Sequence, residues 1–125
     1  MLEVSYFSYG TIYGTVRKYD TDGNDTGAQD ISGYGIFFTV KTAQYQNINS
    51  ILEKSIGTGI TITNGTGGYF SITFSSQDLD RKPQDYFYDC FLNAAGTTFV
   101  ATTSQIKSIG SGIFRISPGA KYGTN

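Results

Sequence analysis

The oxygen-bearing side chains in the segment Asp20-Thr21-Asp22-Gly23-Asn24-Asp25 have a spacing that could hold a cation. Asp20, Asp22 and Asn24 match the first, third and fifth positions of an EF-hand loop, and Ca²⁺ prefers oxygen ligands. The twelfth position, however, is Ile31, where that loop requires a bidentate glutamate. The same segment suits a polar chain reversal, because Asp and Asn side chains bond to their own backbone in turns. We expect no metal site, with calcium at this turn as the weaker alternative.

Groups that commonly perform catalysis are scarce. The chain has no histidine, which excludes nucleophiles activated by a histidine base and the usual zinc sites. Three carboxylates, Asp78, Asp80 and Asp85, lie near two cationic residues, but the stretch is polar and typical of a solvated loop. Cys90, the one cysteine, falls on an alternating apolar face and is expected to be a buried structural thiol. We therefore predict no catalytic residue, no cofactor and no enzyme activity.

Composition narrows the class of protein further. With 125 residues the chain suits one domain, and 16 Gly, ten Tyr and nine Phe favour a turn-rich β protein. The net charge is −1 with scattered Lys and Arg, so no basic stripe for nucleic acid is expected. No apolar run approaches the roughly 20 residues of a membrane-spanning helix, so we expect no membrane partner.

The central element of the chain is predicted to be a hairpin in Ser55–Phe74. Apolar side chains recur there at every second position, which is the period of a strand with one buried face. The glycine-rich Asn64–Gly68 between the two halves predicts a hairpin turn. The other expected strands are 2–6, 11–19, 34–42, 51–56, 86–92, 97–103 and 113–116.

Seven to nine short strands separated by turn signals predict an antiparallel β-sandwich. Between the strands, 43–50 is expected to be a loop, and 75–80 a single helical turn that ends before Pro83. We place one domain at residues 1–118 and a flexible C-terminal tail at 119–125.

Short motifs follow one another in a fixed order over roughly residues 9 to 118. They are Tyr9-Gly10-Thr11 through Tyr19, Asp22-Gly23, Asp30-Ile31-Ser32-Gly33, Thr39-Val40-Lys41, Lys54, Gly59-Ile60-Thr61-Ile62, Gly68 through Ile72, Tyr86 through Asp89, Gly96, and Gly112 through Ile116. In this order they resemble the small immunoglobulin-like proteins of tailed bacteriophages. That family is similar to the N-terminal domain of the upper baseplate proteins that carry receptor-binding parts.

The resemblance implies an immunoglobulin-like sandwich and a structural, non-enzymatic role in a virion. The expected protein is a tail or baseplate adaptor that attaches fibres or receptor-binding proteins through protein contacts, in several copies within a symmetric assembly. Its expected location is the virion, with the host cytoplasm during assembly. Family members with a role in adhesion often continue into long C-terminal segments, whereas this sequence ends at Asn125, which favours attachment over direct receptor binding.

Two alternatives remain for the function. A β-sandwich can also bind a carbohydrate or a host receptor, and the aromatic surface would allow this, although the lack of Trp counts mildly against a saccharide platform. A head or neck decoration protein is the other alternative.

Alternation also assigns the two faces of the strands. The inward face is predicted to be Val16, Ile36, Phe38, Val40, Ile60, Ile62, Phe70, Ile72, Phe74, Tyr86, Tyr88, Cys90, Leu92, Phe114 and Ile116. Aromatic residues next to these positions must then point outward, namely Phe37, Tyr69, Phe87 and Phe91. Because aromatic residues are enriched at protein contacts, we predict that these four form the interface with a partner chain. The alternative is that a strand bulge or the loop 43–50 covers them.

Overall fold

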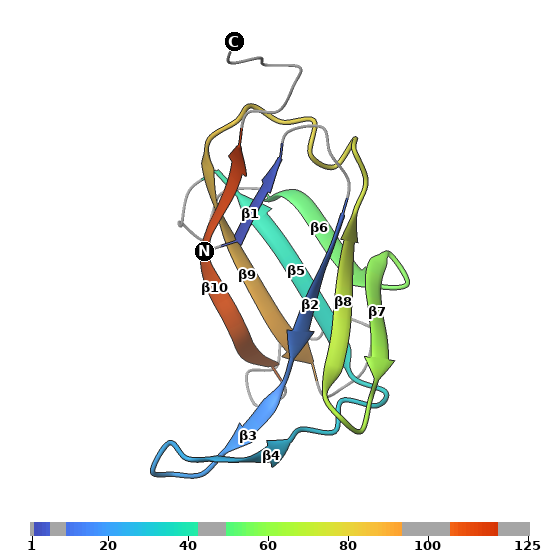
Figure 1. Ribbon diagram of the computed structural model, residues 1–125, viewed down its shortest axis with the longest axis vertical. Helices are drawn as coiled ribbons and strands as arrows, with labels where there is room; N and C mark the ends of the chain where they lie inside the picture. Colours follow the sequence, from blue (N-terminus) through green and yellow to red (C-terminus); the bar gives the residue numbers. More distant parts are fainter. Residues whose placement is uncertain (1, 6–9, 43–49, 94–105, 118–125) are drawn as a thin grey trace.

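The computed structural model describes residues 2–5, 10–42, 50–93 and 106–117, which form strands and turns without a helix (Figure 1). The strands are β1 (Leu2–Ser5), β2 (Gly10–Thr15), β3 (Arg17–Tyr19), β4 (Asp25–Ala28), β5 (Gly35–Lys41), β6 (Ser50–Ile56), β7 (Gly59–Asn64), β8 (Tyr69–Phe74), β9 (Asp85–Asn93) and β10 (Ile106–Ser117). The predicted all-β class is confirmed. Over the same ranges no helix is long and apolar enough to cross a membrane.

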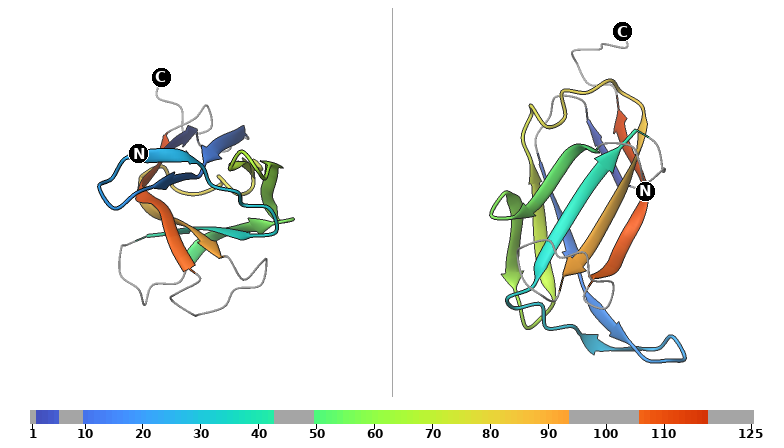
Figure 2. Two further views of the ribbon diagram at one scale, coloured as in Figure 1. Left: turned by 90° about the horizontal axis from the view of Figure 1, so that it is seen from below. Right: turned by 180° about the vertical axis from the view of Figure 1, so that it is seen from behind.

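Eight of the described strands form one curled sheet in the order β1-β10-β9-β5-β6-β7-β8-β2. Most neighbours are antiparallel, as predicted, but β1 pairs with β10 and β6 with β7 in parallel. The curl brings β2 at one end of the sheet round toward β1 and β10 at the other (Figures 1 and 2). Strands β3 and β4 form a separate two-stranded arm that projects from the body of the molecule (Figure 1).

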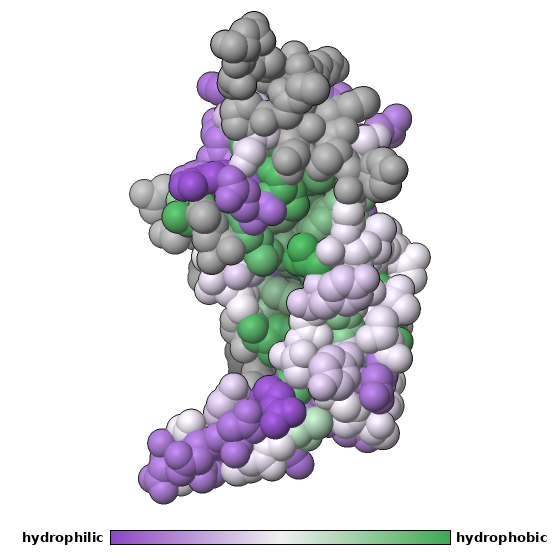
Figure 3. All heavy atoms as spheres, viewed as in Figure 1, coloured by the Kyte–Doolittle hydropathy of each residue, from purple (hydrophilic) through white to green (hydrophobic). Residues whose placement is uncertain are grey.

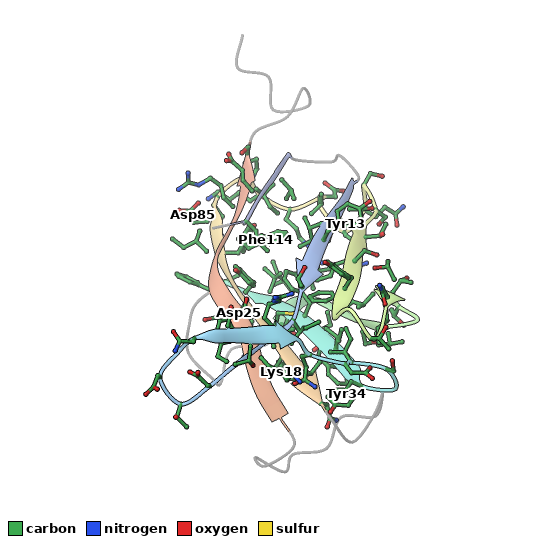
Figure 4. All side chains as sticks on the ribbon, turned by 60° about the horizontal axis from the view of Figure 1, so that its bottom comes forward. Tyr13, Lys18, Asp25, Tyr34, Asp85 and Phe114 are labelled. Atoms are coloured by element: carbon green, nitrogen blue, oxygen red, sulfur yellow. The ribbon has the colours of Figure 1, made fainter. Side chains whose placement is uncertain are left out.

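The core fills the space that the curled sheet encloses. Phe38 on β5, Phe74 on β8 and Phe114 on β10 have ring centroids 5.7 to 5.9 Å apart, although β6 and β7 separate β5 from β8 in the sheet. Figure 4 shows Phe114 pointing into this enclosed space. The predicted inward face is confirmed as buried, except that Ile62 and Tyr88 are only partly buried against the core.

Two core residues, Ile31 and Leu79, were not among the predicted set, and each has less than 2 % of its surface exposed. Both lie in turns rather than strands, where alternation gives no information. Ile31 follows Asp30, whose carboxylate accepts the N–H of Ser32 at 2.9 Å. This local turn directs the apolar side chain between the two polar ones into the core.

The central hairpin forms as predicted, from β7 and β8, with Ile60 opposite Ile72 and Ile62 opposite Phe70. Asn64 Oδ1 accepts the N–H of Gly67 at 3.1 Å and closes the turn. Gly68 has φ +75°, and a Cβ there would lie 2.4 Å from the carbonyl oxygen of Val16, so only glycine fits.

The single long strand predicted for 11–19 is wrong, because the chain changes partner at Val16. Up to Thr15 it pairs with β8, which begins at Tyr69 and offers no partner beyond that point. The N–H of Val16 donates to the carbonyl of Gly68 at 2.8 Å, and the carbonyl of Val16 accepts from the N–H of Gln29 at 3.1 Å. From Arg17 onward the chain pairs with β4, which produces the projecting arm.

The predicted helical turn at 75–80 is a non-helical turn. The N–H of Ser75 donates to Asp78 Oδ2 at 2.7 Å, while the N–H of Asp78 donates to the Ser75 hydroxyl at 3.2 Å. β10 begins earlier than predicted and carries an irregularity between Ser108 and Gly110. The strand predicted at 97–103, the tail at 119–125 and most of the loop 43–50 lie outside the described residues.

Candidate functional site

The outer surface of the β5–β9 strand pair carries three of the four predicted interface residues, and two of the three stack on each other. Phe37 and Phe91 are direct partners across the two antiparallel strands. Their rings stack with centroids 5.4 Å apart and an interplanar angle of 21°. Alternation explains the placement, because the neighbouring residues Phe38 and Cys90 are also partners and face the core.

A surface hollow of about 470 Å³ adjoins this aromatic pair. The residues that line it, together called the β5–β9 hollow, are Phe37, Thr39, Glu53, Lys54, Ser55, Thr58 and Phe91. The register between β5 and β6 brings these residues together, since Glu53 lies opposite Thr39 and Ser55 lies opposite Phe37. The hollow therefore combines two stacked rings with hydroxyl groups and one carboxylate.

The two charged side chains that line the β5–β9 hollow have different hydrogen-bond partners. Glu53 Oε1 accepts a hydrogen bond of 2.6 Å from the hydroxyl of Ser50. Lys54 stands opposite the buried Phe38, and its Nζ donates to Asp78 Oδ2 at 2.6 Å, 5.9 Å from the centroid of the Phe74 ring. The lysine charge is therefore turned toward the inner side of the sheet.

Opposing effects act on the pKa of the Asp78 carboxyl group. Partial burial favours its neutral form, but the Lys54 ammonium and the Ser75 N–H together outweigh burial, so its pKa lies below the ordinary value. Side-chain exposure is 12 % for Lys54 and 21 % for Asp78, so water screens this pair only in part. The pair ties β6 to the turn after β8, beside the hollow.

The other two predicted interface residues do not join Phe37 and Phe91 directly. Phe87 is on the same side of β9 as Phe91, but the exposed Asp89 lies between them along the strand. Tyr69 is on β8, which β6 and β7 separate from β5. It is 46 % exposed and lies near the base of the β3–β4 arm, opposite Thr15.

The acidic turn at Asp20–Asn24 is the end of the β3–β4 arm. Asp20 Oδ1 accepts the backbone N–H groups of Asp22 and Asn24, each at 2.9 Å. The N–H of Asn24 is the largest cause of the lowered pKa of Asp20, with partial desolvation opposing it and the N–H of Asp22 adding to it. The arm itself is held by Arg17, which donates to both oxygens of Asp25 at 3.0 and 3.2 Å.

The Asp20 side chain therefore bonds to the backbone of its own turn. This is the polar chain reversal that the sequence favours over a calcium loop. Across the described ranges, no three His, Cys, Asp or Glu side chains gather in a way that could hold a metal ion. Figure 4 shows the arm with Lys18 on β3 and Asp25 on β4.

Cys90 is buried on the inner face of β9, as predicted. Burial, with a smaller effect of the neighbouring Asp89, raises the pKa of its thiol to about 12. The thiol is therefore protonated at neutral pH and is a poor nucleophile.

Sequence reasoning missed the polar half of the β5–β9 hollow. Thr39 could have been found, because it lies two residues after Phe37 and so on the same face. Glu53, Ser55 and Thr58 could not, because their approach depends on the register between β5 and β6 and on the turn that follows. Comparison with known proteins adds no relative, because no protein-family model and no curated protein matches this chain.

Proposed function

We propose that this protein is a non-enzymatic structural component of a tailed-phage virion. It acts as an adaptor in the tail or baseplate and attaches fibres or receptor-binding proteins through protein contacts. The order of motifs from Tyr9 to Ile116 supports the virion assignment. The stacked Phe37–Phe91 pair beside the β5–β9 hollow carries the proposed mode of attachment.

The hollow has the features of a protein contact. Aromatic side chains are enriched where partners bind, and they contribute most when a pocket beside them receives a partner side chain. Its volume of about 470 Å³ has room for a large side chain. Because the Lys54 charge is taken up by Asp78, an apolar or hydroxyl-bearing side chain would enter without meeting an unpaired ammonium group.

The curled sheet is, in this proposal, an immunoglobulin-like sandwich. One layer would be β2, β8 and β7, and the other β5, β9 and β10, with β6 at the turn between them. The contacts of Phe74 with Phe38 and Phe114 support two layers, since they join strands that are not neighbours in the sheet. The view from below in Figure 2 agrees with this arrangement.

Mass spectrometry of purified virions tests the assignment. The phage that encodes this chain is purified on a density gradient, and its proteins are quantified against the major tail protein. The proposal predicts the chain in several copies per particle, and tailless heads prepared in parallel should lack it. Its absence from intact virions would overturn the proposal, and its presence in the isolated heads would instead indicate the decoration role.

The same hollow supports a second candidate, binding of a saccharide. Rings with nearby hydroxyl and carboxylate groups are the groups that sugars contact, and Phe91, Thr39 and Glu53 line one cavity. Glycan-array binding by wild-type protein and by Phe91→Ser separates the candidates. Binding that is lost in the variant would favour a host-surface role, whereas an array without signal would leave protein attachment.

A further inference from the structure

Among the described strands, the curled sheet does not close between β2 and β10. β1 pairs only with Phe114–Ser117 of β10, so the part of β10 before Phe114 has β9 on one side and no described strand on the other. The outer edge of β2 likewise has no partner among the described strands. These two edges bound a cavity of about 160 Å³, which we call the β2–β10 groove. Figure 3 shows hydrophobic residues in this gap.

The floor of the β2–β10 groove is apolar core. Phe70 and Tyr88 contribute rings, while Ile12 and Ile109 line its two sides. Leu2, at the start of β1, lines it as well. A cavity of roughly 150 Å³ in a protein interior accepts a benzene ring, so this groove has room for one large aliphatic or aromatic side chain.

The edge of β2 lacks the usual protection against strand pairing. Exposed edge strands normally carry charged side chains, proline or a bulge that blocks another chain. Gly10–Thr15 contains none of the charged residues and no proline, and it pairs with β8 in unbroken register. Tyr13, labelled on β2 in Figure 4, is 80 % exposed. This edge is therefore open to a further strand.

β1 shows how such a strand would lie. It runs parallel to β10, with Leu2 opposite Phe114. Following the pairings through the sheet, β2 runs antiparallel to β10. Consider a segment that extends the line of β1 from Leu2 in the direction opposite to Val4. It would lie parallel to β10 beside Ile109–Ile113, and antiparallel to β2 on its other side. Only an extended chain can pair with backbone groups on both sides at once.

We propose that the β2–β10 groove accepts an extended segment of a partner protein, which adds as a strand between β2 and β10. One apolar side chain of that segment enters the cavity over Phe70 and Tyr88. The segment cannot belong to a sheet of the partner protein, because β2 and β10 pair with both of its edges. A second folded copy of this chain does not meet that condition, since its β2 is already paired with its own β8.

The β2–β10 groove has free space beside Gly110 of β10. A Cβ added at Gly110 would meet nothing nearer than Tyr88, at 3.9 Å. This inference is independent of the virion role, because it rests on the sheet edges alone.

The test is selection of random nine-residue peptides, by display on the immobilised full-length protein. Enriched peptides should carry apolar residues at alternate positions, as strands with one buried face do. Hydrogen exchange with the most enriched peptide should slow exchange at Gly10–Thr15 and Ile109–Ile113, and leave the β5–β9 hollow unchanged.

Three variants locate the binding. Ile12→Glu puts a charge on one wall of the groove, and Gly110→Leu fills it from the other side. Each should weaken peptide binding at least about tenfold, a change of about 1.4 kcal/mol. Ile62→Glu is the matched control, because Ile62 is also partly buried against the core but lies on β7, outside the groove. It should bind the peptide as wild type does, and melting curves identify any variant that has lost its fold.

Several results would overturn the proposal. They are no enrichment above the library background, enriched peptides without alternation, and equal binding by wild type and Gly110→Leu. Protection at sites other than the two edges has the same consequence. A wild-type dimer in solution with β2 protected in the absence of peptide would identify a second copy as the occupant instead.

Discussion

At the scale of single residues, the Lys54–Asp78 ion pair is less exposed than the Arg17–Asp25 and Arg115–Asp85 pairs. Lysine at an inward position of a strand is costly unless its charge is paired. Asp78 supplies the pairing at 2.6 Å and is itself held by the Ser75 N–H. A Cβ at Gly59 would lie 2.5 Å from the Lys54 side chain, so a glycine at the first position of β7 leaves room for the lysine stem.

Replacing Asp78 by Asn should lower the free energy of unfolding at neutral pH by about 1–3 kcal/mol, because Lys54 loses a charged hydrogen-bond partner. The pKa of Asp78 is lower in the folded protein than its ordinary value of 3.8, so the unfolded chain binds the proton first as pH falls. The stabilisation is therefore complete only well above this ordinary value, at about pH 5 and higher, and is lost as pH falls through the folded pKa.

Urea unfolding of wild type and Asp78→Asn from about pH 7 to about pH 3 measures this difference. Asp20, Asp25, Asp30 and Asp85 also have lowered pKa values, but they are present in both proteins and cancel in the comparison. A difference that does not shrink on acidification would show that the ion pair is not its source.

At the scale of elements, alternation along β5 decides which face each side chain occupies. Phe38 is 1 % exposed and contacts the rings of Phe74, Tyr88 and Phe114. Phe38→Ala should therefore lower the free energy of unfolding by about 3–5 kcal/mol. Its neighbour Phe37 is on the outer face and only partly buried, so Phe37→Ala should cost about 1–2 kcal/mol. Urea unfolding of both variants is the measurement, and a larger loss for Phe37→Ala would mean the faces are reversed.

The β2–β8 pair depends on a glycine that an aromatic ring covers. Gly14 lies opposite Phe70, and a Cβ there would be 2.3 Å from the ring. Gly14→Ala should lower the free energy of unfolding by about 1–3 kcal/mol, since the Phe70 ring must leave its position against Gly14 and its contacts there. Gly10 on the same strand has nothing within 4 Å of such a Cβ, so Gly10→Ala is the control.

Thermal and urea unfolding of the two alanine variants decide the point. Gly10→Ala should be neutral or slightly stabilising, because alanine has less freedom than glycine in the unfolded chain. Equal effects of the two substitutions would show that the Phe70 ring does not restrict Gly14.

Much of the inner face could be predicted from sequence, because alternation needs only the strand itself. Phe38, Phe70 and Phe114 are buried where the period placed them. What could not be predicted depends on distant parts of the chain. The stacking of Phe37 on Phe91 requires the register of β5 on β9, and the burial of Leu79 requires a turn that folds onto the core. The β2–β10 groove requires the order of all eight strands.

At the scale of the whole molecule, two surfaces suited to binding lie apart. The β5–β9 hollow is on the outer face in the middle of the sheet, and the β2–β10 groove lies where its two ends approach. The first offers side chains and the second offers backbone edges, so they fit different kinds of partner. Two separate contacts would suit the adaptor role that we propose.

The arm of β3 and β4 projects from the body of the molecule and is hydrophilic (Figures 1 and 3). It carries Tyr19, which is 60 % exposed and belongs to a different sheet from the Phe37–Phe91 stack. Tyr19→Ser therefore provides a control for the loss of one exposed aromatic side chain.

The measurement that tests attachment through the β5–β9 hollow most directly is the occupancy of variant protein in purified virions. Phage is grown with the chain replaced by the Phe37→Ser/Phe91→Ser double variant or by Tyr19→Ser, and copies per particle are counted by mass spectrometry. Occupancy of the double variant should fall at least about tenfold, as loss of a central aromatic contact implies, while Tyr19→Ser should match wild type. A double variant that melts like wild type and still enters particles at full occupancy would contradict the account.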